Sequence, residues 1–131
     1  MGFVAAVPVR WSDIDMYQHI NHATMVTILE EARIPFLREP FGATIDTIGL
    51  LIAEVNISYK GQLRLVDSPL QVTMWSKRVR AVDFTIGYEI RGANDSPDLK
   101  PACVASTQMA VVDIEKHALR RLTDTEKDYL R

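Results

Sequence analysis

Cysteine is nearly absent from the sequence, which has a single one, Cys103, in 131 residues. One cysteine cannot form an internal disulfide, so the chain lacks the pattern of a small secreted fold held together by disulfides. Cys103 lies in the apolar run 102–105. We interpret it as a small core residue and not as a nucleophile, because buried thiols are usually inert.

The sequence also has no large excess of charge of either sign. Its 15 Lys and Arg residues nearly balance 17 Asp and Glu residues, for a formal net charge of -2. A protein with a general affinity for nucleic acid would carry a basic excess. We therefore expect no nucleic-acid partner.

Long hydrophobic runs are missing too. No stretch approaches the roughly 20 apolar residues that a transmembrane helix needs. The apolar segment 1–9 is short, is interrupted by Pro8 and has no basic leader, so it does not look like a signal peptide. We therefore expect a cytoplasmic protein with no membrane partner.

What the sequence does contain is enough apolar material for one core. Hydrophobic residues make up 47% of the chain and charged residues 24%, which is ordinary for a globular protein. A chain of this length fits one compact domain. We predict a single domain over 1–131.

The hydrophobic pattern changes its period along the chain. Apolar residues at alternate positions over 7–11 predict a short first strand. A stripe with steps of three and four then predicts one helix after Asn21, its N-cap, and Pro35 should end or kink that helix. The remaining elements are strands over 51–60, 70–75, 84–91 and 102–114, and a tail helix over 123–130 with a Thr123–Glu126 capping box.

This order of elements predicts an α+β fold. Strands joined by short loops should pair antiparallel. One helix cannot cover both faces of a sheet, so the natural solution is a curved antiparallel sheet wrapped around the helix.

The polar segment 10–22, between the first predicted strand and the helix, is the candidate site. It holds Asp13, Asp15, His19, Asn21 and His22 in a short stretch. Loops between rigid elements commonly carry catalytic groups. The free N–H groups at the start of the helix would offer donors to a developing oxyanion.

These residues alone leave other interpretations open. Asp13 or Asp15 could cap a turn, and both histidines could lie half-exposed in a loop. Asp15, His19 and His22 could also bind zinc, although no cysteine or further histidine cluster completes such a site.

The segment Val9-Arg10-Trp11-Ser12-Asp13-Ile14-Asp15, followed by His19-Ile20-Asn21, resembles the signature of the 4-hydroxybenzoyl-CoA thioesterase family. The helix carries Glu30-Glu31-Ala32-Arg33 where that family has a Glu-Ala-Arg element, and the similarity covers nearly the whole chain. The resemblance implies the hotdog fold, a curved five-stranded antiparallel sheet around one long helix. It also implies an acyl-CoA thioesterase.

The resemblance assigns a role to each site residue. Asp15 matches the catalytic carboxylate, which attacks the thioester or activates a water. The main-chain N–H of His22 matches the oxyanion donor. His19 would orient or polarise the site, and Asn21 would cap the helix or hold a water. Gln18 departs from the family, which usually has glycine at that position.

The expected substrate brings its own requirements. Coenzyme A carries phosphates, for which we name Lys60, Arg64 and Arg78 as candidate ligands, and Tyr17 is a candidate for the acyl tunnel. CoA is part of the substrate, so we expect no cofactor and no metal. In the family, active sites lie between paired subunits, which implies a homodimer or a dimer of dimers.

Three further interpretations complete the sequence analysis. Asp13 is interpreted as a turn residue or a partner of Arg10. For Glu30 and Glu31 we favour a hydrogen bond between subunits over a catalytic role. Two other functions stay open: a hotdog enoyl-CoA hydratase or dehydratase, and an acyl-thioester binding module without catalysis.

Overall fold

The computed structural model describes residues 2–44 and 47–131, so three positions of the predicted domain, Met1, Ile45 and Asp46, lie outside the described residues. The main element is one antiparallel sheet in the order β1-β3-β4-β5-β2, and a short strand β6 pairs with β5. The strands are β1 Phe3–Val7, β2 Ile48–Tyr59, β3 Leu70–Lys77, β4 Asp83–Arg91, β5 Cys103–Asp113 and β6 Ala118–Leu119.

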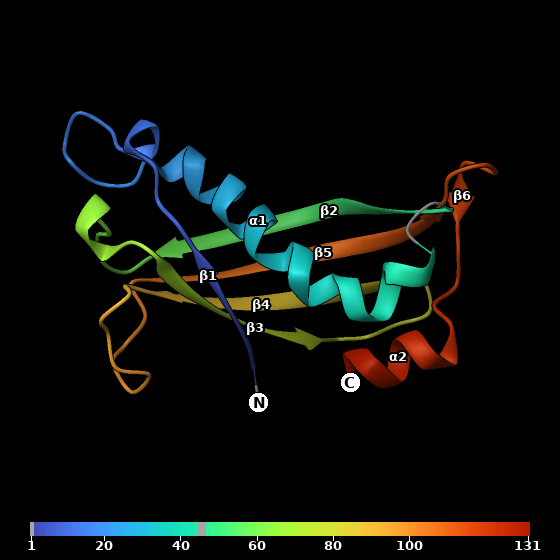
Figure 1. The fold of residues 1–131 in the computed structure, drawn as a ribbon. Helices are drawn as coiled ribbons and strands as arrows, with labels where there is room; N and C mark the ends of the chain where they lie inside the picture. The colour runs from blue at the N-terminus through green and yellow to red at the C-terminus, as the bar shows by residue number, and fades with distance from the viewer. Residues whose placement is uncertain (1, 45–46) are drawn as a thin grey trace.

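The long helix α1 (His22–Phe41) crosses one face of this sheet, roughly along the strands (Figure 1). It contacts β1, β3 and the short tail helix α2 (Asp124–Leu130). The core between helix and sheet contains Leu29, Phe41, Phe84 and Tyr88, all at most 1% exposed. Burying side chains of this size stabilises the fold by roughly 1.5–3 kcal/mol each. The predicted helix and the sheet wrapped around it are confirmed.

Both predicted helix caps are present. The Asn21 side chain accepts a hydrogen bond from the N–H of Ala23 at 2.8 Å. In α2, Thr123 and Glu126 form the reciprocal capping box. These contacts satisfy N–H groups that have no partner inside a helix.

The first strand was predicted too late in the chain. Val7 and Val9 are buried, as their alternation suggested, but the strand ends at Val7. Pro8 has no N–H for the sheet, and the N–H of Val9 donates to Ser68 Oγ at 2.8 Å instead. Trp11 then begins a 3-10 turn, Trp11–Asp13, and is 83% exposed.

Of the two outcomes expected at Pro35, an end or a kink of the helix, the end is wrong, since α1 continues to Phe41 and includes Pro35 and Pro40. Proline removes one hydrogen bond per site. Burial of Phe36, Leu37 and Phe41 offsets that loss. The pattern also missed β6, because two residues are too short to show a period.

Candidate active site

A tight loop presents Asp15 at the end of the molecule where α1 begins (Figure 1). Ile14 and Ile20 form an isolated antiparallel bridge that closes the loop. Inside it, the N–H of Asp15 donates to the His19 carbonyl at 2.9 Å, and the N–H of Gln18 donates to the Asp15 carbonyl at 3.0 Å. The backbone position of Asp15 is therefore fixed on both sides.

Gln18 has a positive φ of 67°, in the left-handed region that glycine enters without strain. This is the position where the resembling family usually has glycine. The loop therefore has a backbone that glycine would suit, with a glutamine held in it at a cost of roughly 1–2 kcal/mol. The Gln18 side chain borders a cavity next to Asp15.

Backbone donors orient the Asp15 carboxylate. Its Oδ1 accepts the N–H of Tyr17 at 2.9 Å and, more weakly, the N–H of His19 at 3.4 Å. Across residues 2–44 and 47–131 we find no hydrogen bond to Oδ2. One carboxylate oxygen thus holds the group in place, and the other has no hydrogen-bond partner among the described residues.

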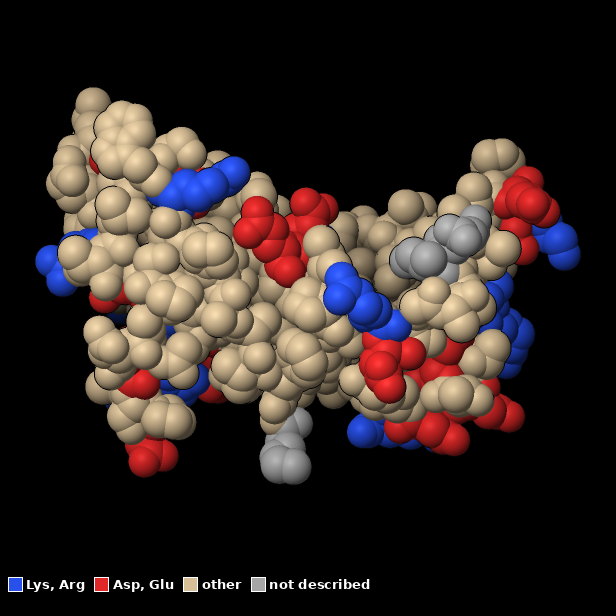
Figure 2. All heavy atoms as spheres, viewed as in Figure 1, with Lys and Arg blue, Asp and Glu red and all other residues tan. Residues whose placement is uncertain are grey.

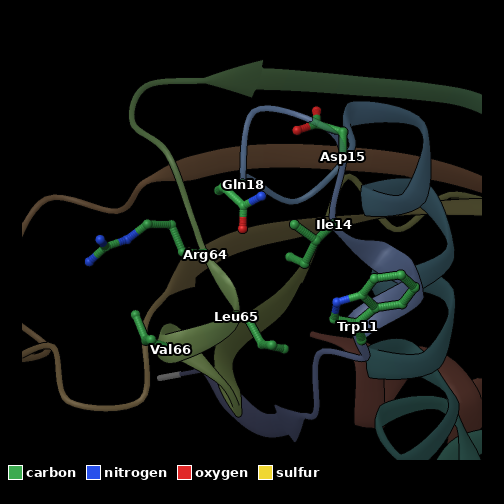
Figure 3. Close-up of a pocket in the computed structure, with 7 residues that line it drawn as sticks. All are labelled: Trp11, Ile14, Asp15, Gln18, Arg64, Leu65 and Val66. Atoms are coloured by element: carbon green, nitrogen blue, oxygen red, sulfur yellow. The ribbon is translucent and has the colours of Figure 1, made fainter.

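Asp15 borders two cavities. The first, of about 360 Å³, is lined by Trp11, Ile14, Asp15, Gln18, Arg64, Leu65 and Val66. Figure 3 shows Asp15 and Gln18 on the loop and Arg64 on the segment after β2, with the Arg64 side chain extending away from Asp15. The second cavity, of about 190 Å³, is lined by Asp15, His19, Ile20, His22, Met25, Tyr59, Gly61, Gln62, Leu63 and Cys103.

The start of α1 faces the second cavity. His22 is the first residue of the helix, so its N–H has no intrahelical acceptor, and no other acceptor is found within the described part of the chain. The Tyr59 hydroxyl donates to the His22 carbonyl at 2.6 Å. Partial burial raises the pKa of Tyr59 above its usual value, and the phenol, which is protonated at neutral pH in any case, can donate. Tyr59 thereby ties the end of β2 to the first turn of the helix.

Asp13 has a structural role, which confirms its interpretation as a turn residue and partner of Arg10. Its carboxylate is buried and accepts the N–H of Arg10 at 2.8 Å and the Arg10 guanidinium at 3.2 Å. The Asp13 carbonyl accepts the N–H of Asn21 at 2.9 Å, and the N–H of Ile20 donates to the Leu63 carbonyl at 2.8 Å. These contacts anchor both ends of the Asp15 loop.

The structure brings together Asp15, His19 and the backbone of His22, and it uses the Asn21 side chain as a helix cap. Among the predicted substrate-binding residues, Arg64 borders the first cavity, and Lys60 adjoins Tyr59 and Gly61 of the second. Tyr17 lies at the loop tip, 72% exposed. Arg78 follows the far end of β3, near α2, at the opposite end of the sheet (Figure 1).

Tyr59 and Cys103 are among the lining residues of the second cavity that the sequence did not assign to a site. Tyr59 is one of the alternating residues of a strand, and its neighbours along the chain give no sign that it belongs to a site. Cys103 pairs with it across the sheet. Burial raises the pKa of the Cys103 thiol to about 11, and its side chain is 1% exposed, which confirms the core interpretation.

Neither a metal centre nor a membrane helix emerges from the described residues. Within 2–44 and 47–131, no group of three or more His, Cys, Asp and Glu side chains is placed to hold a metal ion. In the same residues no helix combines the length and apolarity needed to cross a bilayer.

Comparison with known families gives one match over nearly the whole chain. The model of the thioesterase-like superfamily matches residues 9–129. No curated protein sequence matches the chain significantly.

Solved structures share the architecture at low sequence identity. The PA2801 protein from Pseudomonas aeruginosa has a TM-score of 0.83 at 20% identity, over 98% of this chain and 97% of that chain. YbaW from Escherichia coli gives 0.81 at 22% identity, over 97% and 95%. Slr0204, a 1,4-dihydroxy-2-naphthoyl-CoA thioesterase from Synechocystis, gives 0.79 at 15% identity, over 99% and 96%. These likenesses show that the fold is the predicted hotdog fold.

Proposed function

The chain belongs to the thioesterase-like superfamily, and from that premise we propose that it is an acyl-CoA thioesterase that releases a free acid and CoA. The observation that carries the proposal is the cavity that Asp15 shares with the start of α1 at His22. It offers a free carboxylate oxygen beside an unused helix N–H. The narrower assignment to the 4-hydroxybenzoyl-CoA thioesterases stays a prediction.

In the proposed reaction, the thioester carbonyl oxygen accepts the N–H of His22. As the carbonyl carbon becomes tetrahedral, negative charge develops on that oxygen, and the N–H together with the helix dipole stabilises it. One such donor typically contributes roughly 3 kcal/mol to lowering the barrier. Because the donor is a backbone group, its position depends on the contacts that hold the helix start.

Asp15 promotes attack on the thioester carbonyl carbon by one of two routes. As a general base, Oδ2 takes a proton from water while the water oxygen bonds to the carbonyl carbon; the C–S bond then breaks and the CoA thiolate leaves. As a nucleophile, Oδ2 bonds to that carbon itself and expels the thiolate, and water then hydrolyses the resulting anhydride. Both routes need the oriented carboxylate.

The other site residues have supporting roles in this proposal. His19 borders the cavity half-buried and orients the substrate or a water. Asn21 fixes the helix start through its cap. Arg64, with Lys60 nearby in the chain, is the candidate for the CoA phosphates. Tyr17, exposed at the loop tip, stays a candidate for contact with the acyl group. The reaction consumes only water, so we expect no cofactor or metal requirement.

We also propose that the working form is a homodimer or a dimer of dimers. The chain leaves the outer edge of β2 without a strand neighbour among the described residues. Leu51, Ile52, Val55 and Tyr59 on this strand are 56%, 41%, 36% and 49% exposed. An apolar, unpaired edge of this length is a template for a second copy.

A panel of acyl-CoA thioesters of different chain length tests the function, with released CoA trapped by a thiol-reactive dye in the presence of EDTA. We expect hydrolysis of at least one member. Binding of acyl-CoA without turnover would favour the binding-module alternative, and addition of water to an enoyl-CoA would favour the hydratase.

A further inference from the structure

Three exposed apolar side chains border the cavity of about 360 Å³ next to Asp15 (Figure 3). They are Trp11, Leu65 and Val66, which are 83%, 41% and 71% exposed. Trp11 belongs to the turn before the Asp15 loop, whereas the other two belong to the connection between β2 and β3. A single exposed apolar side chain is ordinary, but several around one cavity indicate a binding surface.

The backbone around Trp11 is well held although its side chain is exposed. The Trp11 carbonyl accepts the N–H of Ile14 at 3.2 Å, and the buried carboxylate of Asp13 accepts the N–H of Arg10 at 2.8 Å. The indole is therefore presented from a fixed turn. A tryptophan on such a turn offers a large contact area at a small cost in side-chain entropy.

The polar groups of this cavity have a definite order. Asp15 lies at one side, and the side chain of Arg64 extends away from it (Figure 3). In the part of the chain that the structure describes, no ion pair to Arg64 is found. The amide of Gln18 borders the same cavity. The lining thus combines the carboxylate proposed to act on the thioester, apolar walls with one amide, and a cation that points outward.

The substrate of the proposed function has the same order of groups. CoA joins its thiol to its phosphates through a pantetheine arm, which has two amide groups and a carbon with two methyl groups. The methyl groups suit apolar walls, an amide plane can stack on an indole, and the Gln18 amide can donate and accept hydrogen bonds. With the thioester at Asp15 and the phosphates at Arg64, the arm is the part that lies between them.

We propose that this cavity binds the pantetheine arm and that Trp11 is its main contact. The proposal rests on the thioesterase function proposed above. The acyl group then lies on the other side of Asp15, toward the cavity at His22. Trp11 does not touch the reacting atoms; it makes the site specific for thioesters whose carrier has a pantetheine arm.

Removal of the indole, measured with three carriers of one acyl group, tests this specificity. The carriers are CoA, pantetheine and N-acetylcysteamine, which lacks the dimethyl carbon and the second amide. We expect Trp11→Ala to raise KM about tenfold for the first two with kcat within about twofold, because the contact stabilises ground and transition states alike. For the N-acetylcysteamine thioester kcat/KM should not change. Trp75→Phe, at the only other tryptophan, is the control.

Fluorescence measures the same contact without turnover. Trp75 packs over Gly87 toward the far end of β3, and in Trp75→Phe the only tryptophan is Trp11. An indole that leaves water emits at shorter wavelength, so CoA and pantetheine should shift the emission. Adenosine 3′,5′-bisphosphate, which lacks the arm, should not. If Trp75→Phe does not fold, the difference between wild-type and Trp11→Ala spectra gives the same signal.

Three results would overturn the proposal. The first is a wild-type KM of Trp11→Ala for acyl-pantetheine, and the second is an equal loss with the N-acetylcysteamine thioester. The third is a rise in KM for acyl-CoA alone with an emission shift from the bisphosphate, which would place the adenine on Trp11. If no acyl-CoA is hydrolysed, the proposed function fails, and the emission shift still decides whether the arm binds at Trp11.

Discussion

At the scale of single residues, the Tyr59 hydroxyl has the most direct influence on the proposed oxyanion site. It holds the His22 carbonyl at 2.6 Å, one residue from the peptide that carries the donor N–H. Removing the hydroxyl in Tyr59→Phe should loosen that donor without touching the substrate. We expect kcat to fall about tenfold, part of the loss for a whole donor, with KM nearly unchanged.

The control for this variant is Tyr129→Phe on α2, a half-exposed tyrosine outside the Asp15 cavities. Both proteins should melt like the wild type. If Tyr59→Phe has the wild-type kcat, or if it loses activity only because its melting temperature is lower, Tyr59 does not position the donor.

Gln18 provides a second test at this scale, through stability. Its φ of 67° strains a side chain that glycine would not have. Gln18→Gly should raise the free energy of unfolding by about 0.5–1 kcal/mol, because relief of the strain exceeds the added freedom of the unfolded chain. Urea denaturation measures it, with Gln62→Gly as the control that should lower stability. A Gln18→Gly protein that is less stable than the wild type would contradict the claim that Gln18 is strained.

The residues around Asp15 also show which parts of the candidate site could be predicted from the sequence. Asp15, His19 and His22 could be named as candidates because they lie close together along the chain in a segment that resembles a family motif, and the structure places them around one cavity. Tyr59 reaches the same cavity from 37 positions beyond His22, so its contact depends on the fold and left no local signal. Gln18 was noted as an unusual residue, but only the backbone shows why glycine suits that position.

At the scale of elements, periodicity predicted the long strands and both helices, since each buries one face. Periodicity gave wrong element ends where a residue is buried without taking part in the hydrogen bonding of the element, or the reverse. Val9 is buried like a strand residue, yet Pro8 ends β1. A proline such as Pro35 is typical of a helix end, yet α1 continues past it because the residues that follow are buried.

The connection between β2 and β3 forms a wall of both cavities and carries the cation proposed for CoA. Arg64→Glu should raise KM for acyl-CoA several-fold with little change in kcat, since a phosphate contact stabilises ground and transition states alike. The effect should shrink at high salt. Arg78→Glu, at the other end of the sheet, is the matched control. An equal rise from Arg78→Glu would move the phosphate site there.

At the scale of the whole molecule, the chain is organised around a covered side and an open side. The helix packs toward β1 and β3, and β2 keeps apolar side chains and its outer edge exposed. The sequence alone could not show this asymmetry, because the alternation in 51–60 looks the same whether a strand lies at the centre or at the edge of a sheet. The homodimer proposed above would cover this edge with a second copy.

The central claim is that the free carboxylate of Asp15 performs thioester hydrolysis. Asp15→Asn keeps the size of the side chain and its acceptor oxygen for the loop, so it should fold normally. Steady-state acyl-CoA hydrolysis, run beside a circular dichroism melt and beside the exposed control Asp98→Asn, measures the claim directly. The account predicts a loss of at least about a hundredfold in kcat for Asp15→Asn and none for Asp98→Asn. A folded Asp15→Asn protein that turns over acyl-CoA at the wild-type rate would contradict it.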